Sequence, residues 1–257
     1  MIYIGTCGYS YKDWVGPVYP EGTRSANMLE HYSSRFDFVE INSSFYHMPG
    51  LQLFESIVKR TPNRFKTAVK LFQGFTHTDA PDMKLADNFL YSIQPLIESG
   101  RLVCLLAQFP YSFHYTDRNL DRLKQLRQWF SGLQVNVEFR NNEWVRKDVV
   151  ELLKKEDLGF VCVDEPKVRG LVGKVLVTTS QVSYLRMHGR NSAKWYGEEG
   201  LERYNYLYGR NELMEWLPGI MEFEKSSAIT VIAFNNHPKG QAVENAGMIA
   251  DILSQRL

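Results

Sequence analysis

The stretch that decides the fold is Val135-Asn136-Val137-Glu138-Phe139-Arg140-Asn141-Asn142-Glu143-Trp144, near the middle of the chain. Its first half alternates apolar and polar residues, which is typical of a strand with Asn136, Glu138 and Arg140 on one face. Asn141 or Asn142 can then cap a helix, because apolar residues follow at helical spacing from Val145 to Leu153. The stretch predicts a strand that delivers a carboxylate and a guanidinium at its end and turns at once into a helix.

The same alternation of strand and helix extends in both directions along the chain. Seven further strands are predicted at residues 3–6, 38–42, 65–70, 102–108, 160–164, 182–188 and 229–234. Helices are predicted around residues 29–36, 54–58, 89–97, 120–130, 213–221 and 246–253. Asp117 is expected to cap one helix, Gly132 to end it, and Pro218 to kink or break another.

Two segments depart from this alternation. Residues 165–181 contain Pro166, Gly170 and Gly173 and have no helical period, so we expect a crossover without a full helix. Residues 189–209 form a long loop rich in Trp and Tyr, long enough to act as a lid.

These elements predict a single (β/α)8 TIM-type barrel over residues 1–257, and the length of 257 residues is typical of that fold. A doubly wound sheet is the alternative. It would favour a GxGxxG turn after the first strand, which Gly5-Thr6-Cys7-Gly8 does not match.

The composition narrows the class of protein. With 44% apolar residues, 23% charged residues and a net charge of +1, the chain is a globular protein without an overall electrostatic attraction for nucleic acid or membranes. Cys7, Cys104 and Cys162 are widely spaced and form no CxxC, so we expect reduced thiols in a cytoplasmic protein. No apolar run approaches about 18 residues, so neither a signal peptide nor a membrane-spanning helix is expected.

The predicted site is the face of the barrel where the strands end, because TIM barrels keep their function there. Polar residues collect at these ends: Thr6, Glu40, Asn42, Lys70, Gln108, Glu138, Arg140, Asp164, Arg186, His188, Asn235 and Asn236. Pairs spaced two apart, such as Glu138 with Arg140 and Arg186 with His188, point the same way. A structural ion network is the plainer interpretation. Arg140 fits either role, since it could pair with Glu40 or Asp164 or could contact a substrate.

The polar residues at the strand ends and the nearby aromatic residues divide into catalytic candidates and candidates for substrate binding. The catalytic candidates are Glu138, His188, Asp164 and Lys70, and Glu138 is the strongest candidate for acid–base chemistry. The candidates for substrate binding are Arg140, Arg186, Glu40, Asn42, Asn235, Gln108, Tyr9, Trp14, Tyr46 and His77. Lys70 could be an electrostatic clamp or could form a Schiff base. We favour the clamp because nearby carboxylates are expected to raise its pKa.

No cofactor is predicted. A divalent metal is the less favoured alternative, because the chain lacks HxH and HExxH motifs and the predicted rim carries Lys and two Arg. Such a rim suits an anion, either a small molecule or a nucleic-acid backbone. Tyr and Trp residues in the predicted loops would suit stacking on a base or sugar.

The chain resembles the bacterial domain-of-unknown-function 72 family, also called YecE-like. The resemblance spans essentially the whole chain. It rests on segments such as Ile4-Gly5-Thr6-Cys7-Gly8-Tyr9, Glu40-Ile41-Asn42, Glu138-Phe139-Arg140, Tyr184-Leu185-Arg186-Met187-His188-Gly189 and Phe234-Asn235-Asn236. It implies a TIM-type barrel and names no reaction. The family's barrel is similar to apurinic-site endonucleases, but the metal-binding histidines of those enzymes have no matching set here.

Three functional hypotheses follow. The first is an enzyme that acts on an anionic substrate bearing phosphate or carboxylate, by hydrolysis or isomerisation. The second is a protein that binds or processes nucleic acid, and the third is a barrel that binds a ligand without catalysis.

Overall fold

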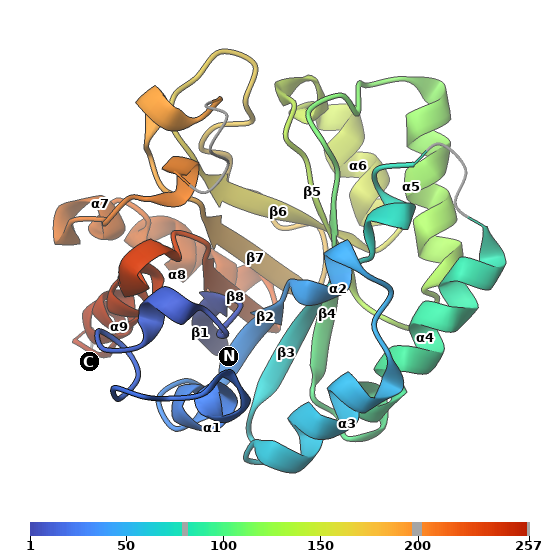
Figure 1. The fold of residues 1–257 in the computed structure, drawn as a ribbon. Helices are drawn as coiled ribbons and strands as arrows, with labels where there is room; N and C mark the ends of the chain where they lie inside the picture. The colour runs from blue at the N-terminus through green and yellow to red at the C-terminus, as the bar shows by residue number, and fades with distance from the viewer. Residues whose placement is uncertain (79–81, 197–201, 256–257) are drawn as a thin grey trace.

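The computed structural model describes residues 1–78, 82–196 and 202–255, and its centre is a closed barrel of parallel strands (Figure 1). The strands are β1 (Ile2–Cys7), β2 (Phe38–Ile41), β3 (Lys66–Lys70), β4 (Leu102–Gln108), β5 (Val135–Glu138), β6 (Leu158–Asp164), β7 (Val182–Met187) and β8 (Ile229–Phe234). Each strand pairs with its neighbours in chain order, and β1 closes the barrel against β8. The predicted TIM-type barrel is therefore confirmed.

Helices cover the outside of the barrel (Figure 1). They are α1 (Met28–Ser33), α2 (Ser43–Tyr46), α3 (Leu51–Arg60), α4 (Met83–Glu98), α5 (Asp117–Trp129), α6 (Lys147–Lys155), α7 (Arg210–Met214), α8 (Leu217–Ser226) and α9 (Gln241–Ser254). The crossover from β6 to β7 contains no helix, as its Pro and Gly residues predict. Pro218 lies in the first turn of α8, where its missing N–H costs nothing, so the helix predicted there is broken in two.

Two predicted helix starts are wrong. Thr116, not Asp117, caps α5: its side chain accepts a hydrogen bond from the Asn119 N–H, and Asp117 is the first residue of the helix. Asn141 caps only a short 3-10 turn, and α6 begins at Lys147, beyond Val145. The turn ends at Trp144, which is buried and whose ring stacks on Phe139 at 4.6 Å.

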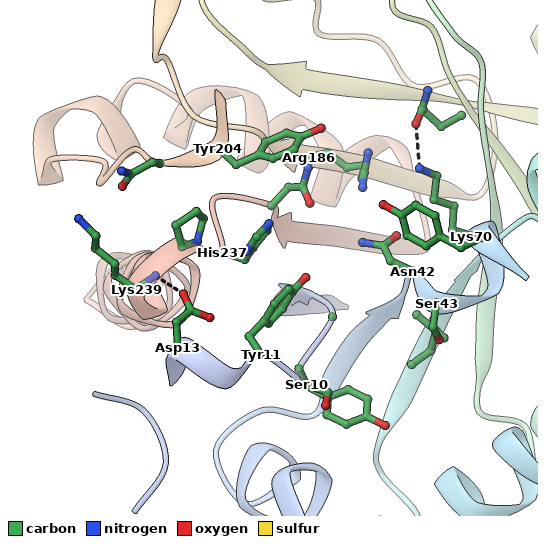
Figure 2. Close-up of a pocket in the computed structure, with 18 of the residues that line it drawn as sticks. Ser10, Tyr11, Asp13, Asn42, Ser43, Lys70, Arg186, Tyr204, His237 and Lys239 are labelled. Atoms are coloured by element: carbon green, nitrogen blue, oxygen red, sulfur yellow. Dashed lines mark hydrogen bonds between the residues drawn. The ribbon is translucent and has the colours of Figure 1, made fainter. Parts of the chain in front are cut away.

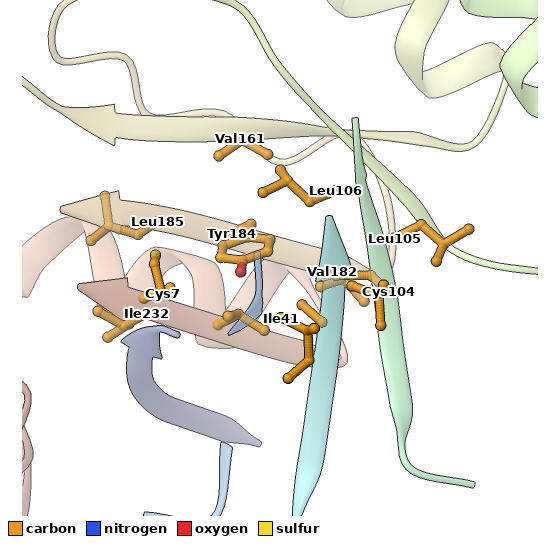
Figure 3. Close-up of a cluster of buried hydrophobic side chains, with 14 of the residues drawn as sticks. Cys7, Ile41, Cys104, Leu105, Leu106, Val161, Val182, Tyr184, Leu185 and Ile232 are labelled. Atoms are coloured by element: carbon orange, nitrogen blue, oxygen red, sulfur yellow. The ribbon is translucent and has the colours of Figure 1, made fainter. Parts of the chain in front are cut away.

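The core has one apolar layer inside the barrel and another between strands and helices. Figure 3 shows buried side chains from strands around the barrel, among them Ile41, Cys104 and Val161. In the outer layer, Phe75 packs edge-on against Phe89 at 5.7 Å. Each fully buried side chain of this size contributes roughly 1.5–3 kcal/mol, so these two layers hold the strand ends in place.

The register of the barrel aligns the ends of the strands that carry polar residues. Cys7 lies opposite Glu40, Gln108 lies opposite Glu138, and Asp164 lies opposite Met187. Side chains from sequence-distant strands therefore meet at one end of the barrel.

No helix within the described ranges combines the length and apolarity that a membrane crossing needs.

Candidate functional site

A cavity of about 750 Å³ opens where the strands end, between the loops that follow β1, β2, β7 and β8. It is lined by Gly8, Tyr9, Ser10, Tyr11, Asp13, Ile41, Asn42, Ser43, Tyr46, Lys70, Gln108, Arg140, Arg186, Glu202, Tyr204, Asn205, Asn235, His237, Pro238 and Lys239. Figure 2 shows Lys70 and Asn42 at one side of the cavity, Lys239 and Asp13 at the other, and Tyr11 and His237 between them. We call Lys70, Gln108, Arg140 and Arg186 the cavity floor, because they come from the strand ends.

Arg186 is the centre of a buried ion cluster, which we define as Glu40, Glu138, Arg140 and Arg186. Its Nε and Nη2 donate to the two carboxylate oxygens of Glu40 at 2.9 and 2.6 Å, and its Nη1 donates to Glu138. The Tyr184 hydroxyl also donates to Glu40 at 2.6 Å. Both carboxylates are fully buried, so Arg186 compensates charges that would otherwise be costly.

Glu138 is held as an anion. Its Oε1 lies 2.7 Å from Nε of Arg140 and 3.2 Å from Nε2 of His188. Burial alone would raise the pKa of Glu138, but Arg140, Arg186 and His188 hold it well below its usual range. This environment stabilises a permanent carboxylate rather than a group that exchanges a proton near neutral pH.

His188 is neutral in this arrangement. Burial and the nearby Arg140 lower its pKa to about 3, despite the opposing effect of Glu138. Its Nδ1 lies 3.0 Å from Nδ2 of Asn235. Because an amide nitrogen only donates, Nδ1 accepts and Nε2 carries the proton that faces Glu138.

Lys70 has a different environment from the arginines. Its Nζ donates to Oε1 of Gln108 at 2.8 Å and lies 3.9 Å from the centre of the Phe45 ring. Within the described ranges, no carboxylate forms an ion pair with it. Burial and the positive charge of Arg186 lower the pKa of Lys70 to about 7, although Glu138 and Glu40 act in the opposite direction. The carboxylates do raise this pKa as expected, but burial and the arginines outweigh them, so the expected net direction is wrong.

Glu165, which the sequence did not single out, lies next to the cluster. It directly follows β6, and its Oε1 accepts the Gly173 N–H at 3.2 Å. Its Oε2 is 3.9 Å from Nη1 of Arg140. Burial raises the pKa of Glu165 to about 7, with Arg140 opposing. Glu165 could have been recognised in the sequence as a candidate, because it is a second carboxylate directly after Asp164 at the end of a predicted strand.

The cavity floor keeps a positive side chain available to an anion. Arg140 and Arg186 balance Glu40 and Glu138, and His188 is neutral. Glu165, which lies 3.9 Å from Arg140 and has a pKa of about 7, is only partly charged at neutral pH. A protonated Lys70 then adds a positive charge that no carboxylate in the described ranges balances by direct pairing. The side chain of Arg140 is 12% exposed and lines the cavity, and none of the described residues is hydrogen-bonded to its terminal nitrogens. These N–H groups can therefore donate to a ligand.

One wall of the cavity is aromatic. The rings of Tyr11 and His237 stack in parallel at 4.4 Å, and Tyr204 lies 6.0 Å from His237. Burial lowers the pKa of His237 to about 4, so this ring is neutral and adds no charge. His237 and Tyr204 were not predicted as site residues. His237 follows β8, and Tyr204 lies in the long loop after β7.

The structure brings most of the predicted residues together. Those that line the cavity are Lys70, Arg140, Arg186, Asn42, Asn235, Gln108, Tyr9 and Tyr46. Glu40 and Glu138 are buried and contact floor residues without lining the cavity, and His188 is buried against Glu138. The centre of the predicted lid, residues 197–201, lies outside the described residues.

Three predicted residues lie away from the cavity. Trp14 is fully buried, and its indole N–H donates to the His237 carbonyl at 2.7 Å, so it packs the loops instead of contacting a substrate. Asp164 accepts hydrogen bonds from Tyr208 at 2.8 Å and Trp216 at 2.6 Å, and it pairs with Arg190. His77 is exposed beside Phe45, with ring centres 4.9 Å apart.

Metal-ligating residues do not converge in the part of the chain that the structure describes. No group of three or more His, Cys, Asp and Glu side chains there is placed to hold a metal ion. Cys7, Cys104 and Cys162 are buried free thiols.

The family model described as "Protein of unknown function DUF72" matches residues 3–257. The chain belongs to the DUF72 family. It is 31% identical over 270 residues to the UPF0759 protein YunF of Bacillus subtilis strain 168, a match that covers 98% of this chain and 95% of YunF.

Solved structures of DUF72 proteins agree with the barrel. A DUF72 family protein from Thermotoga maritima MSB8 has 37% sequence identity and a TM-score of 0.92, with 99% of both chains covered. A DUF72 family protein from Enterococcus faecalis V583 has 27% identity and a TM-score of 0.89, covering 99% of this chain and 96% of its own. These similarities confirm the family and the fold, and the names of these DUF72 proteins assign no reaction.

Proposed function

We propose that this protein is an enzyme that binds a small anionic substrate, bearing carboxylate or phosphate, in the cavity at the strand ends. The observation that carries the proposal is the pair of cations on the cavity floor. Arg140 lines the cavity, and none of the described residues is hydrogen-bonded to its terminal nitrogens. Lys70 has a neutral amide as its hydrogen-bond partner. An anion entering the cavity would gain charge-assisted hydrogen bonds from both side chains.

The neighbouring residues divide into two roles in this proposal. Asn42 and Asn235 line the cavity and would orient polar groups of the substrate. Glu138 and His188 position Arg140, since Glu138 contacts its Nε and His188 contacts Glu138. Arg186 has its guanidinium occupied by Glu40 and Glu138, so its main contribution is the positive potential of the floor.

Proton transfer is assigned to the groups that titrate near neutral pH. The pKa of Lys70 and that of Glu165 are both about 7, which suits an acid or base that operates in the cell. Lys70 lines the cavity and can exchange a proton with a substrate. Glu165 does not line it, and because a guanidinium does not pass on a proton, Glu165 would act only by changing the charge beside Arg140. Hydrolysis and isomerisation are both compatible with such groups, and no step of the proposal uses a cofactor.

The proposal is tested by measuring thermal unfolding with inorganic phosphate, sugar phosphates, nucleotides and carboxylic acids at low ionic strength. A ligand at a hundred times its Kd is expected to add about 2.7 kcal/mol to the unfolding free energy. The stabilisation should disappear in Lys70→Met and Arg140→Met. It should persist in Lys66→Met, because Lys66 lies at the other end of β3, where its Nζ donates to the Gly100 carbonyl. If no anion raises the Tm, the proposal fails.

The two alternatives predict different results. A nucleic-acid protein would bind duplex or single-stranded DNA or RNA in a mobility-shift assay, most strongly at low salt. The cations on the cavity floor favour a group that enters the cavity over a polymer that lies across the loops. A barrel that only binds would hold the anion that stabilises it without converting it, which product analysis after prolonged incubation would show.

A further inference from the structure

We propose that Lys70 is a nucleophilic amine that forms an imine with the carbonyl group of an anionic substrate. The inference rests on the proposed function and specifies its substrate class: a small aldehyde or ketone that also carries a carboxylate or phosphate group. It assigns to Lys70 a covalent step in place of a purely electrostatic one.

The contacts of Lys70 allow the neutral amine, because none of them is to a carboxylate. Lys70 ends β3 and lines the cavity, where its Nζ contacts the Gln108 amide oxygen at 2.8 Å and the Phe45 ring at 3.9 Å. Neither neighbour carries a charge. The carboxylates of Glu40 and Glu138 are instead taken up by the two arginines of the ion cluster, so they do not pair with Nζ. Among the residues that the structure describes, Lys70 thus has polar support without an ion-pair partner.

Burial and the arginines increase the share of neutral amine. Burial and Arg186 lower the pKa of Lys70 from 10.5 to about 7, and Arg140 contributes as well, while Glu138 and Glu40 oppose the change without cancelling it. At pH 7 such an amine is neutral in about half of the molecules, whereas an ordinary lysine is neutral in fewer than about one in a thousand. Only the neutral form has the lone pair that attacks a carbonyl carbon.

The cavity also explains why the substrate would carry an acid group. Arg140 lines the same floor, and its terminal nitrogens are not hydrogen-bonded to any described residue, so it can hold the carboxylate or phosphate while the carbonyl carbon meets Nζ. The amides of Asn42 and Asn235 line the same space and can hydrogen-bond the carbonyl oxygen. The cavity volume of about 750 Å³ suits a small molecule.

The step balances without an oxidant or reductant. The lone pair of neutral Nζ forms a C–N bond as the carbonyl π bond breaks, and one proton passes from the nitrogen to the oxygen to give a carbinolamine. A proton taken up from solvent then leaves with the hydroxyl group as water while the nitrogen lone pair forms the C=N bond, and the product is a protonated imine. The positively charged imine then withdraws electrons from the adjacent carbon, and hydrolysis returns the amine.

The test uses glyoxylate, which combines an aldehyde with a carboxylate, together with sodium cyanoborohydride, which reduces imines to stable secondary amines. The whole protein is incubated at pH 7, and peptide mass spectrometry follows modification of each lysine with time. Lys70 is expected to be labelled at least about tenfold faster than Lys66 of the same strand, because about half of the Lys70 side chains carry the reactive neutral amine at pH 7 and Arg140 can hold the carboxylate beside it. Propanal, which lacks the acid group, should show a smaller preference for Lys70.

Two variants sharpen the result. Gln108→Glu places a carboxylate beside Nζ, favours the ammonium form, and should slow labelling at pH 7 with recovery at higher pH. Lys70→Arg keeps the charge, cannot form an imine, and should still bind glycolate, which has the carboxylate but no carbonyl group.

The possible outcomes separate this inference from the proposed function. Labelling of Lys70 no faster than Lys66, with glycolate still stabilising the protein, would overturn the imine and leave the anion site intact. Equal labelling with no stabilisation by glycolate, phosphate or the other anions would overturn both.

Discussion

Lys70 meets an amide and not a carboxylate at the end of the neighbouring strand: its Nζ donates to Oε1 of Gln108 over 2.8 Å. Because β3 pairs directly with β4, this contact is fixed by the barrel itself. An amide oxygen supports a protonated amine without neutralising it, so burial continues to penalise the charge. The pH behaviour of the protein should show this.

Lys70→Met is expected to increase the free energy of unfolding relative to wild type, and more so at pH 7 than at pH 9.5. The folded pKa of Lys70 is about 7, below its ordinary value of 10.5, so the unfolded chain binds the proton more tightly. The penalty is full below pH 7 and fades as pH rises towards 10.5. Urea denaturation at the two pH values checks this, because pH-independent effects cancel in the difference. A difference that does not change with pH would contradict it.

Glu165→Gln should have the opposite pH dependence. The folded pKa of Glu165 is raised to about 7 from 4.5, so its ionisation destabilises the folded state as pH rises through that range. Relative to wild type, the variant is expected to be more stable at pH 8 than at pH 5 in chemical denaturation. Glu55→Gln, an exposed change on α3, serves as the control and should show little dependence. A larger gain at pH 5 would refute the assignment.

Arg186→Met should destabilise the protein by about 3–5 kcal/mol, because it leaves two buried carboxylates without their main partner. The matched control is Arg64→Met, which removes a solvent-exposed pair with Asp37 and should cost about 0–1 kcal/mol. Equilibrium denaturation of both variants gives the comparison. Similar losses in the two would show that the ion cluster is not compensating buried charge.

Asp164→Asn should lower stability by about 2 kcal/mol or more without changing glycolate affinity. Asp164 accepts from Tyr208 and Trp216 and pairs with Arg190, so its carboxylate fastens the segment after β7 to the barrel. Calorimetric titration and thermal unfolding separate the two effects. An unchanged Tm with lost binding would instead return Asp164 to the substrate site.

The sequence was sufficient for the barrel because period-two strands and period-3.6 helices are local patterns. It also placed Lys70, Arg140 and Asn235 at one end, since parallel strands end together. The expected position of Asp164 at the cavity was wrong. Asp164 lies on the same face of its strand as Phe160 and Cys162, and the Cys162 thiol contacts the Val177 carbonyl of the crossover, away from the cavity.

Other errors arose where no local pattern exists. The pKa of Lys70 depends first on its burial and then on the charges of Arg186, Glu138 and Glu40, so side chains from four strands determine it together. Trp14 lies in a loop, yet the loops after β1 and β8 pack so closely that it is fully buried. Tyr204 and His237 reach the cavity along irregular segments whose course no periodicity predicts.

Arg186 joins strands that are not neighbours in the sheet, since it extends from β7 to Glu40 on β2 and Glu138 on β5. Replacing any one of these three residues leaves a buried charge without its partner. We therefore expect the three to be inherited as a unit over evolutionary divergence, while the surrounding loops acquire new lengths and side chains. A lineage could change what its barrel binds by altering those loops and still keep these three charged residues at the strand ends, where the substrate is proposed to bind.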